Sequence, residues 1–331
     1  MKFILSLFSL TYLFVIGIAL AVAGMVVAFQ MPGPVEEVKE IQIQRGLGTQ
    51  AIGQYLEDEN LIYTKYTFLI GSQLMNGGKP LQAGEFEIPA NASTAQILDI
   101  LQNGKTIQRK FTIPEGQTSW QIVQILKDNE FLDGEIEDIP PEGSLMPETY
   151  FFSKGDSRLE KISRMQQAMA SFVSEQDVTI LEKLPLETME EVVILASIVE
   201  KETSVPSEYA KVAGVFHNRL RIGMALQTDP TVIYGITGGK HQDDGRGPLG
   251  RRLLTRDLQQ DTPFNTYTRT GLPPTPICNP GRAAITAVLN PADHDYLFFV
   301  ADGTGGHAFA KTYKEHQANV AKWRKIRRSQ Q

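Results

Sequence analysis

The chain has 331 residues, of which 42% are hydrophobic and 21% are charged, and its formal net charge is -6 at pH 7. This composition predicts a globular protein with a substantial core, long enough for two domains and an additional segment. The mild negative charge gives no electrostatic reason to expect a nucleic acid partner. A single cysteine, Cys278, excludes an internal disulfide, and we assign it no role. No Cys/His cluster has zinc spacing and no Gly-rich loop resembles a nucleotide cradle, so we expect neither a metal nor a cofactor.

The N-terminal segment reads FILSLFSLTYLFVIGIALAVAGMVVAF from Phe3 to Phe29 and contains no charged residue. It exceeds the roughly 20 residues that cross a bilayer as a helix. A cleaved signal peptide is the alternative, because Ala19-Leu20-Ala21 is a small-x-small site. The apolar stretch continues past this site, which favours an uncleaved anchor over residues 1–30. Lys2 favours a cytoplasmic N-terminus and places the remaining chain outside the cytoplasm.

Residues 31–108 are predicted to form a linker followed by a small α+β subdomain. A strand, a turn and a helix recur at 41–62 and 110–132, and residues 86–105 form a partial copy. In each copy we expect a Ser/Thr-type cap to open the helix. Such units resemble LysM modules, which bind N-acetylated glycans. The alternative is a packing or spacer domain without a ligand.

Residues 109–331 are predicted to form a second, mixed α+β domain, so the whole chain belongs to the α+β class. Beyond Gly223 the sequence is rich in loop-forming residues until a turn at Pro280-Gly281. We expect a buried strand at Tyr296–Gly303. The expected helices cover residues 157–175, 186–202, 208–222, 282–289 and 314–328.

Two glutamates, Glu200 and Glu202, lie at the end of the helix predicted for residues 186–202. At about 100° per residue, Glu200 falls in the same arc as Val192 and Val199. Glu202 falls on the opposite face, which is mixed. The wheel therefore predicts that Glu200 points toward apolar side chains and that Glu202 is solvated or paired.

A carboxylate in apolar surroundings resists ionisation, because burial penalises its charged form. Such a group can hold a proton near neutral pH and deliver it as a general acid. The structural alternative for Glu200 is a buried ion pair with an arginine such as Arg219.

Several long strings follow one another in this chain: EGSLMPETY, ASIVEKET, VAGVFHNRLRIGMALQTDPTVIYG, TPFNTYTRTGLPPTPICNPG and YLFFVADGTGGHAF. With these strings the sequence resembles the MltG (YceG-like) family of endolytic murein transglycosylases over nearly its whole length. The resemblance implies cleavage of the β-1,4 bond between N-acetylmuramic acid and N-acetylglucosamine without water, leaving a 1,6-anhydro-muramyl end. It also implies that the essential glutamate lies within ASIVEKET. We place it at Glu200, with Glu202 as the alternative.

The same resemblance implies a groove for a glycan strand. Gln227 and Asn265 are our first candidates for holding acetamido groups, and Tyr267 could stack on a sugar or orient Glu200. His307 follows a Gly-rich turn and could lie at the groove, or could be a loop histidine bonded to the backbone. The other expected substrate contacts are Thr228, Asp229, Tyr234, Thr266 and Asn279. Three of them have a purely structural alternative: Asp229 as a helix cap, Tyr234 as a core residue and Asn279 as part of a turn.

These inferences predict a single-pass inner-membrane enzyme whose catalytic domain lies in the periplasm and acts on nascent peptidoglycan strands. Partners from the cell-wall elongation machinery are implied by the resemblance alone. Two alternatives stay open: a hydrolytic muramidase that cleaves the same bond, and a membrane-anchored glycan-binding scaffold without turnover.

Overall fold

The computed structural model describes residues 2–74, 79–240 and 248–329, and it describes side chains from Tyr12 onward. The chain divides into two compact units. Unit 1 comprises Met1–Arg109 together with Phe151–Lys154, and unit 2 comprises Lys110–Tyr150 together with Gly155–Gln331.

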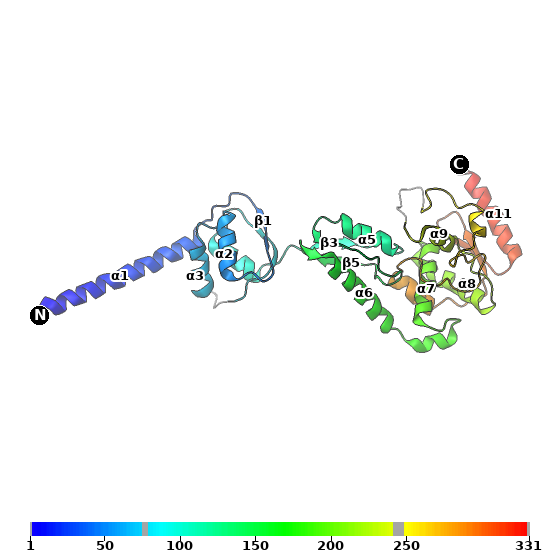
Figure 1. Ribbon diagram of the computed structural model, residues 1–331, viewed down its shortest axis with the longest axis horizontal. Coiled ribbons are helices and arrows are strands. Elements are labelled where there is room, and N and C mark those ends of the chain that lie inside the picture. The colour runs from blue at the N-terminus through cyan, green and yellow to red at the C-terminus, as the bar shows by residue number, and fades with distance from the viewer. Residues whose placement is uncertain (1, 75–78, 241–247, 330–331) are drawn as a thin grey trace. The chain divides into compact units, whose positions relative to one another are not determined.

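The first element of unit 1 is a long apolar helix, α1 (Lys2–Gln30) (Figure 1). Its segment Tyr12–Gln30 has a mean hydropathy of 2.6 over 19 residues. At 1.5 Å per residue this segment is about 28 Å long, close to the thickness of a bilayer's hydrocarbon core. By length and composition, α1 is therefore suited to a single membrane crossing.

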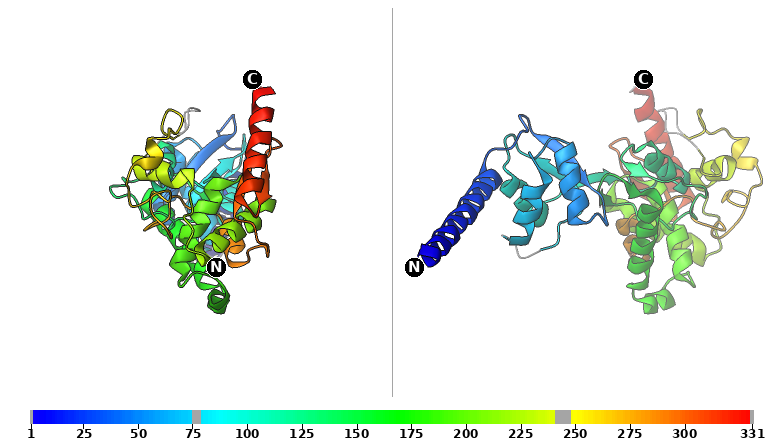
Figure 2. Two further views of the ribbon diagram at one scale, coloured as in Figure 1. Left: turned by 90° about the vertical axis from the view of Figure 1, so that its right-hand side faces the viewer. Right: turned by 60° about the vertical axis from the view of Figure 1, so that its left-hand side comes forward.

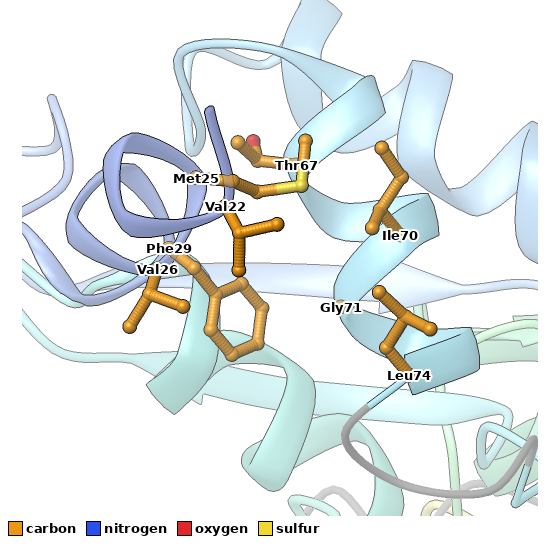
Figure 3. A pocket seen from close by; sticks show the side chains of 8 residues that line it. All are labelled: Val22, Met25, Val26, Phe29, Thr67, Ile70, Gly71 and Leu74. Atoms are coloured by element: carbon orange, nitrogen blue, oxygen red, sulfur yellow. The ribbon is translucent and has the colours of Figure 1, made fainter. Parts of the chain in front are cut away.

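The last turns of α1 pack onto α3 (Lys65–Leu74) (Figure 3). Phe29 is buried there, and a Cβ at Gly71 would lie only 2.2 Å from its ring. Because Gly71 has no side chain, the ring of Phe29 can pack directly against the backbone of α3. The two helices leave between them an apolar groove of about 100 Å³, lined by Val22, Met25, Val26, Phe29, Thr67, Ile70, Gly71 and Leu74.

The rest of unit 1 surrounds an antiparallel pair of strands, β1 (Lys39–Ile43) and β2 (Gly84–Ile88). Ile41 lies opposite Phe86, and both are buried together with the residues two positions further along, as the pleat requires. The helix α2 (Thr49–Asp58) and α3 connect the strands, and α4 (Thr94–Asn103) follows β2. The core of unit 1 lies between these elements and includes Ile52, Leu56, Leu61, Phe68, Ile97 and Leu101.

Helix capping agrees with the sequence in two of the three copies. Ser93 opens α4 and Thr118 opens α5 (Ser119–Asp128), each through a capping box with the glutamine three residues later. At α2 the expected Ser/Thr cap is wrong, because Gly48 occupies the N-cap position without a side-chain bond. Glycine is tolerated there because it reaches the extended N-cap geometry at little cost.

Unit 2 is built around α7 (Met189–Glu202), whose residues from Val192 to Val199 are all buried. The helices α8 (Tyr209–Arg221), α9 (Asp229–Thr237) and α10 (Arg282–Leu289) pack against α7; Figure 1 labels α7, α8 and α9. The chain is thus a mixed α+β protein, as predicted. The helices expected in this region are confirmed within three residues, namely α6 (Arg158–Ser174), α7, α8 (Tyr209–Arg221), α10 (Arg282–Leu289) and α11 (Tyr313–Ser329).

Of the elements of unit 2 that do not appear among the sequence expectations, two carry residues of the site described below. One is α9 (Asp229–Thr237), in the region expected to be loop-rich; Pro230 suits its first turn and Gly238 ends it in the left-handed conformation. The other is β8 (His307–Ala310), which pairs antiparallel with β7 (Phe298–Ala301). β7 is half-buried, not fully buried as expected.

Short elements complete the fold. β4 (Leu132–Asp133) pairs in parallel with β6 (Asp156–Ser157), and α11, the red helix in Figure 2, packs against β7 and β8. The remaining elements are β3 (Arg109–Thr112), which pairs with β5 (Thr149–Phe152), and three 3₁₀ helices at Val178–Lys183, Pro206–Glu208 and Asp257–Gln259.

Candidate active site

A cleft of about 470 Å³ opens in unit 2 at the C-terminal end of α7. This main cleft brings together four residues that were expected at the site: Gln227, Asp229, Tyr267 and His307. Its volume lies in the range of small-ligand sites in proteins. The full lining comprises Glu202, Arg219, Gln227, Asp229, Tyr267, Phe298, Phe299, Val300, Ala301, His307, Tyr313 and His316.

A smaller hollow of about 300 Å³ shares Glu202, Ala301 and His307 with the main cleft. This side hollow adds the Gly-rich turn between β7 and β8 and the indole of Trp323 on α11. A flat apolar face beside a polar cleft is a common platform for one face of a ligand ring. Glu202 is therefore accessible from two connected recesses.

The electrostatic environment of Glu202 favours its protonated form. Burial, and after it the negative charge of Asp229, raise the pKa of this carboxyl to about 8, while the positive charge of Arg219 opposes the rise. The side chain accepts no hydrogen bond from the residues that the structure describes. Glu202 thus carries a proton at neutral pH and presents it to the cleft, which is what a general acid requires.

Glu200 has a different environment, although it lies only two residues away. Tyr209 donates its hydroxyl to Oε1 at 2.7 Å, and the backbone amide of Gly281 donates to Oε2 at 2.9 Å. Gly281 is the N-cap of α10, so the carboxylate sits at a helix N-terminus, where a negative charge is favourable. Glu200 joins α7, α8 and α10, and it does not line the main cleft or the side hollow.

The structure therefore places the two glutamates differently from the helical wheel: Glu202 lines the main cleft, and Glu200 bonds to Tyr209 and Gly281. Because α7 is enclosed on every side, the angular position of a residue does not tell which side holds a cavity. The alternative of an ion pair between Glu200 and Arg219 is also not found. Arg219 donates to the carbonyl oxygens of Leu226 and Leu297, and its charge acts on Glu202.

One wall of the main cleft is held in place by polar contacts. Tyr267 donates its hydroxyl to Oδ1 of Asp229 at 2.6 Å, which fixes the carboxylate whose charge acts on Glu202. Gln227 has a φ of 51°, a left-handed conformation that costs a non-glycine residue free energy. The backbone amide of Gln227 donates to the carbonyl of Thr266, and this bond holds the exposed side chain of Gln227 at the cleft.

Other residues expected to contact substrate lie in the interior instead. Asn265 is fully buried and donates to the carbonyls of Leu258 and Gln260. Thr266 accepts from the backbone amide of Thr228 at 3.0 Å, and both are buried. These residues shape the loop that carries Tyr267, and the geometry does not support their direct contact with a ligand.

Asn279 is also fully buried. Its Oδ1 accepts from the amide of Leu145 at 2.9 Å, and its Nδ2 donates to Ser119 Oγ at 3.0 Å and to Glu142 Oε2 at 3.3 Å. Tyr234 bonds to the same Glu142, whose pKa burial raises to about 7. Asn279 and Tyr234 thus belong to an interior network that joins three loops, not to the main cleft.

We expect Asn279→Ala to lower the free energy of unfolding by about 2–4 kcal/mol, since several buried polar groups lose their partner at once. Chemical denaturation of the purified protein, followed by circular dichroism, measures this loss. Asn290→Ala, at an exposed asparagine of the same unit, is the matched control and should change it by about 0.5 kcal/mol. Equal effects of the two substitutions would contradict the interior role of Asn279.

Sequence reasoning missed several residues of the site. Phe298 lies in the string YLFFVADGTGGHAF but was not singled out, and His316 and Trp323 carry no local motif. Glu208 was also missed; it reaches the site through its contact with His307. Cys278 is buried and its thiol donates to the carbonyl of Ser197 at 3.3 Å. Among the described residues, no three His, Cys, Asp or Glu side chains come close enough to hold a metal ion.

Comparison with known proteins places these features in context. The YceG-like family matches residues 41–322. A protein of Bacillus subtilis (strain 168) named endolytic murein transglycosylase is 31% identical, and the alignment covers 86% of this chain and 84% of the relative. A protein of the same name from Streptococcus pneumoniae (serotype 2, strain D39) is 29% identical over 85% of this chain, which spans only 57% of that relative. The crystal structure of a yceG-like protein from Listeria monocytogenes matches with a TM-score of 0.51 and 32% identity, covering 86% of this chain and 99% of that one.

Proposed function

The chain belongs to the YceG-like family, and from this premise we propose that it is an endolytic murein transglycosylase with Glu202 as its catalytic acid. It cleaves the β-1,4 bond between N-acetylmuramic acid and N-acetylglucosamine inside a glycan strand and leaves a 1,6-anhydro-muramyl end. The observation that carries the assignment of Glu202 is its position: its carboxyl lines a cleft of about 470 Å³, accepts no hydrogen bond from the described residues, and has a pKa raised to about 8.

The chemistry accounts for a site with one acid. Most glycosidases need two carboxyl groups, one as acid and one as base or nucleophile. Here the sugar supplies the nucleophile: Glu202 first protonates the departing oxygen, and the sugar's own 6-hydroxyl attacks C1 after that oxygen has left. The 2-acetamido group shields the oxocarbenium-like carbon. No metal or cofactor enters this scheme.

The walls of the main cleft and the side hollow suit a polysaccharide. The exposed amide of Gln227 offers both a donor and an acceptor to an acetamido group. The hydrogen-bonded pair of Tyr267 and Asp229 presents an oriented polar edge. Trp323 offers an aromatic face on which a pyranose ring can stack.

Unit 1 supports a location of the protein at the membrane. α1 is a single apolar helix suited to cross a bilayer, which we propose to be the inner membrane, with unit 2 in the periplasm. On α3, Tyr66 and Leu74 are exposed on the same side as Ile70, beside the last turns of α1. Aromatic and apolar side chains of this kind suit the membrane interface, so unit 1 would lie close to the outer surface of that membrane.

Unit 1 also fits the proposal of a LysM-like module. Its order β1-α2-α3-β2, with the two strands paired antiparallel, supports a small glycan-binding subdomain over residues 31–108. Contact with the cell-wall elongation machinery follows from the family resemblance alone.

Digestion of purified peptidoglycan, with mass spectrometry of the released ends, tests the proposed function. We expect soluble fragments that end in 1,6-anhydro-muramic acid and strands that are cut internally. Reducing muramyl ends as the sole product would identify a hydrolytic muramidase. Tight binding without any released fragment would identify a glycan-binding scaffold.

A further inference from the structure

A carboxylate–imidazole pair lies beside Glu202 and has no part in the mechanism described so far. Glu208 ends the 3₁₀ helix Pro206–Glu208, and His307 begins β8. Nδ1 of His307 lies 2.7 Å from Oε2 of Glu208, and the backbone amide of His307 donates to Oε1 at 2.9 Å. The side chains are only 15% and 16% exposed. Two contacts from one residue therefore hold this pair in a single geometry.

The local backbone is shaped for this pair. A Cβ at Gly306 would lie 2.8 Å from Oε1 of Glu208, so a glycine lets the strand approach the carboxylate. Thr203, the residue after Glu202, donates its hydroxyl to Oε2 of Glu208 at 3.3 Å. Although burial acts to raise the pKa of Glu208, the hydrogen bonds from His307 and Thr203 hold it below its usual value. Glu208 is therefore a carboxylate that accepts, and the short Nδ1 contact places a proton on Nδ1.

The other imidazole nitrogen faces the site. Nε2 of His307 has no hydrogen-bond partner among the residues that the structure describes. His307 lines both the main cleft and the side hollow, as Glu202 does. With the proton of the neutral ring on Nδ1, Nε2 carries a lone pair that can accept from a hydroxyl of a bound sugar.

Building on the function proposed above, we propose that His307 is the base that accepts the proton of the sugar's 6-hydroxyl, and that Glu208 is the positioning residue that holds a ring proton on Nδ1 and so directs Nε2 to the site. As the bond from O6 to C1 forms, the proton of O6 moves to Nε2. Before this step, the bond from C1 to the departing O4 has broken, and O4 has taken the proton of Glu202. The products are an anhydro ring, a free 4-hydroxyl, ionised Glu202 and an imidazolium that is paired with Glu208. Return of the proton from Nε2 to Glu202 across the shared cleft restores both groups.

Glu208→Gln is the sharpest test, because the glutamine amide can donate to Nδ1 and so favours the opposite tautomer of His307. We expect the maximal rate of anhydro-end release to fall by a factor on the order of 10²–10⁴, with little change in the strand concentration that gives half the maximal rate. The melting temperature should stay close to that of the unmutated protein. We also expect a larger fraction of reducing ends, because water competes once the 6-hydroxyl has lost its base.

A second variant tests His307 directly. His307→Ala should lose activity to a similar extent and regain part of it with added imidazole, which can occupy the vacated space. His294→Gln is the control, because His294 also bonds to the backbone of unit 2 but does not line the main cleft or the side hollow. Unchanged rates and end composition in both Glu208→Gln and His307→Ala would overturn the proposal. An equal fall in both kinds of end, without rescue by imidazole, would also overturn it and indicate a structural role. Failure of the unmutated protein to form anhydro ends would instead contradict the proposed function.

Discussion

Glu202→Gln is expected to lower the release of anhydro-ended fragments from peptidoglycan by a factor of at least about 10³, whereas Glu200→Gln should retain activity within about tenfold of the unmutated protein. Glutamine has the size of glutamic acid but carries no proton that it can transfer. At position 202 the substitution removes the acid that faces the cleft. At position 200 the side chain can still accept one of its two hydrogen bonds, from Tyr209 or from Gly281.

The order of the two variants should be reversed for stability: Glu200→Gln should be the less stable of the two, although it is the more active. In Glu200→Gln, the new NH₂ group faces either the hydroxyl of Tyr209 or the backbone amide of Gly281, and both of these are donors. We expect this loss of one hydrogen bond to lower the free energy of unfolding by about 1–2 kcal/mol. Glu202→Gln breaks no hydrogen bond within the described residues and should leave the melting temperature unchanged or slightly raised. Quantified fragment release together with thermal melts separates the cases. A folded, inactive Glu200→Gln beside an active Glu202→Gln would show that the assignment of the acid is wrong.

Activity is expected to decline above about pH 8, tenfold for each further pH unit, because the acid must be protonated to act. The pKa of Glu202 is raised from 4.5 to about 8, so the protonated form is present throughout the range below this value and is lost as the pH rises through it. Initial rates of fragment release between pH 5 and about pH 10, at saturating substrate, define this alkaline limb.

Asp229→Asn should move the alkaline limb to lower pH. The negative charge of Asp229 is the second cause of the raised pKa of Glu202, and asparagine removes this charge while its Oδ1 can still accept from Tyr267. Asp261→Asn is the control, because Asp261 is exposed, pairs with Arg269 and lies outside the main cleft. An alkaline limb that stays in place in Asp229→Asn, or that moves equally in both variants, would contradict the role given to Asp229.

Much of the fold could be predicted from the sequence, because it depends on local patterns. The apolar run of α1, the capping boxes at Ser93 and Thr118, and the 3.6-residue periodicity of α6, α8 and α11 are all properties of short segments. α9 was missed because a short helix between loops has too few turns to show a period. β8 was missed for a similar reason, since its four residues become a strand only by pairing with β7.

The candidate site could be predicted only in part. Gln227, Asp229, Tyr267 and His307 were found through their strings and do line the main cleft. Asn265 and Asn279 have the same residue chemistry as ligand-binding amides, but in this protein their hydrogen bonds serve the interior. A sequence gives the kind of hydrogen-bonding group and not whether water or the backbone satisfies it.

By itself, the sequence determined the family and the membrane-suited helix, and it predicted that the essential acid lies in the stretch ASIVEKET. Only the tertiary structure distinguishes the surroundings of its two glutamates. Both lie in the last turn of α7, so they differ only in the groups that the rest of the chain places around them. Glu200 meets a hydroxyl and the N-terminus of α10, while Glu202 meets Asp229, apolar walls and open space. Donors and cavities come from segments distant in the chain, and therefore no local pattern could have revealed which carboxyl faces the cleft.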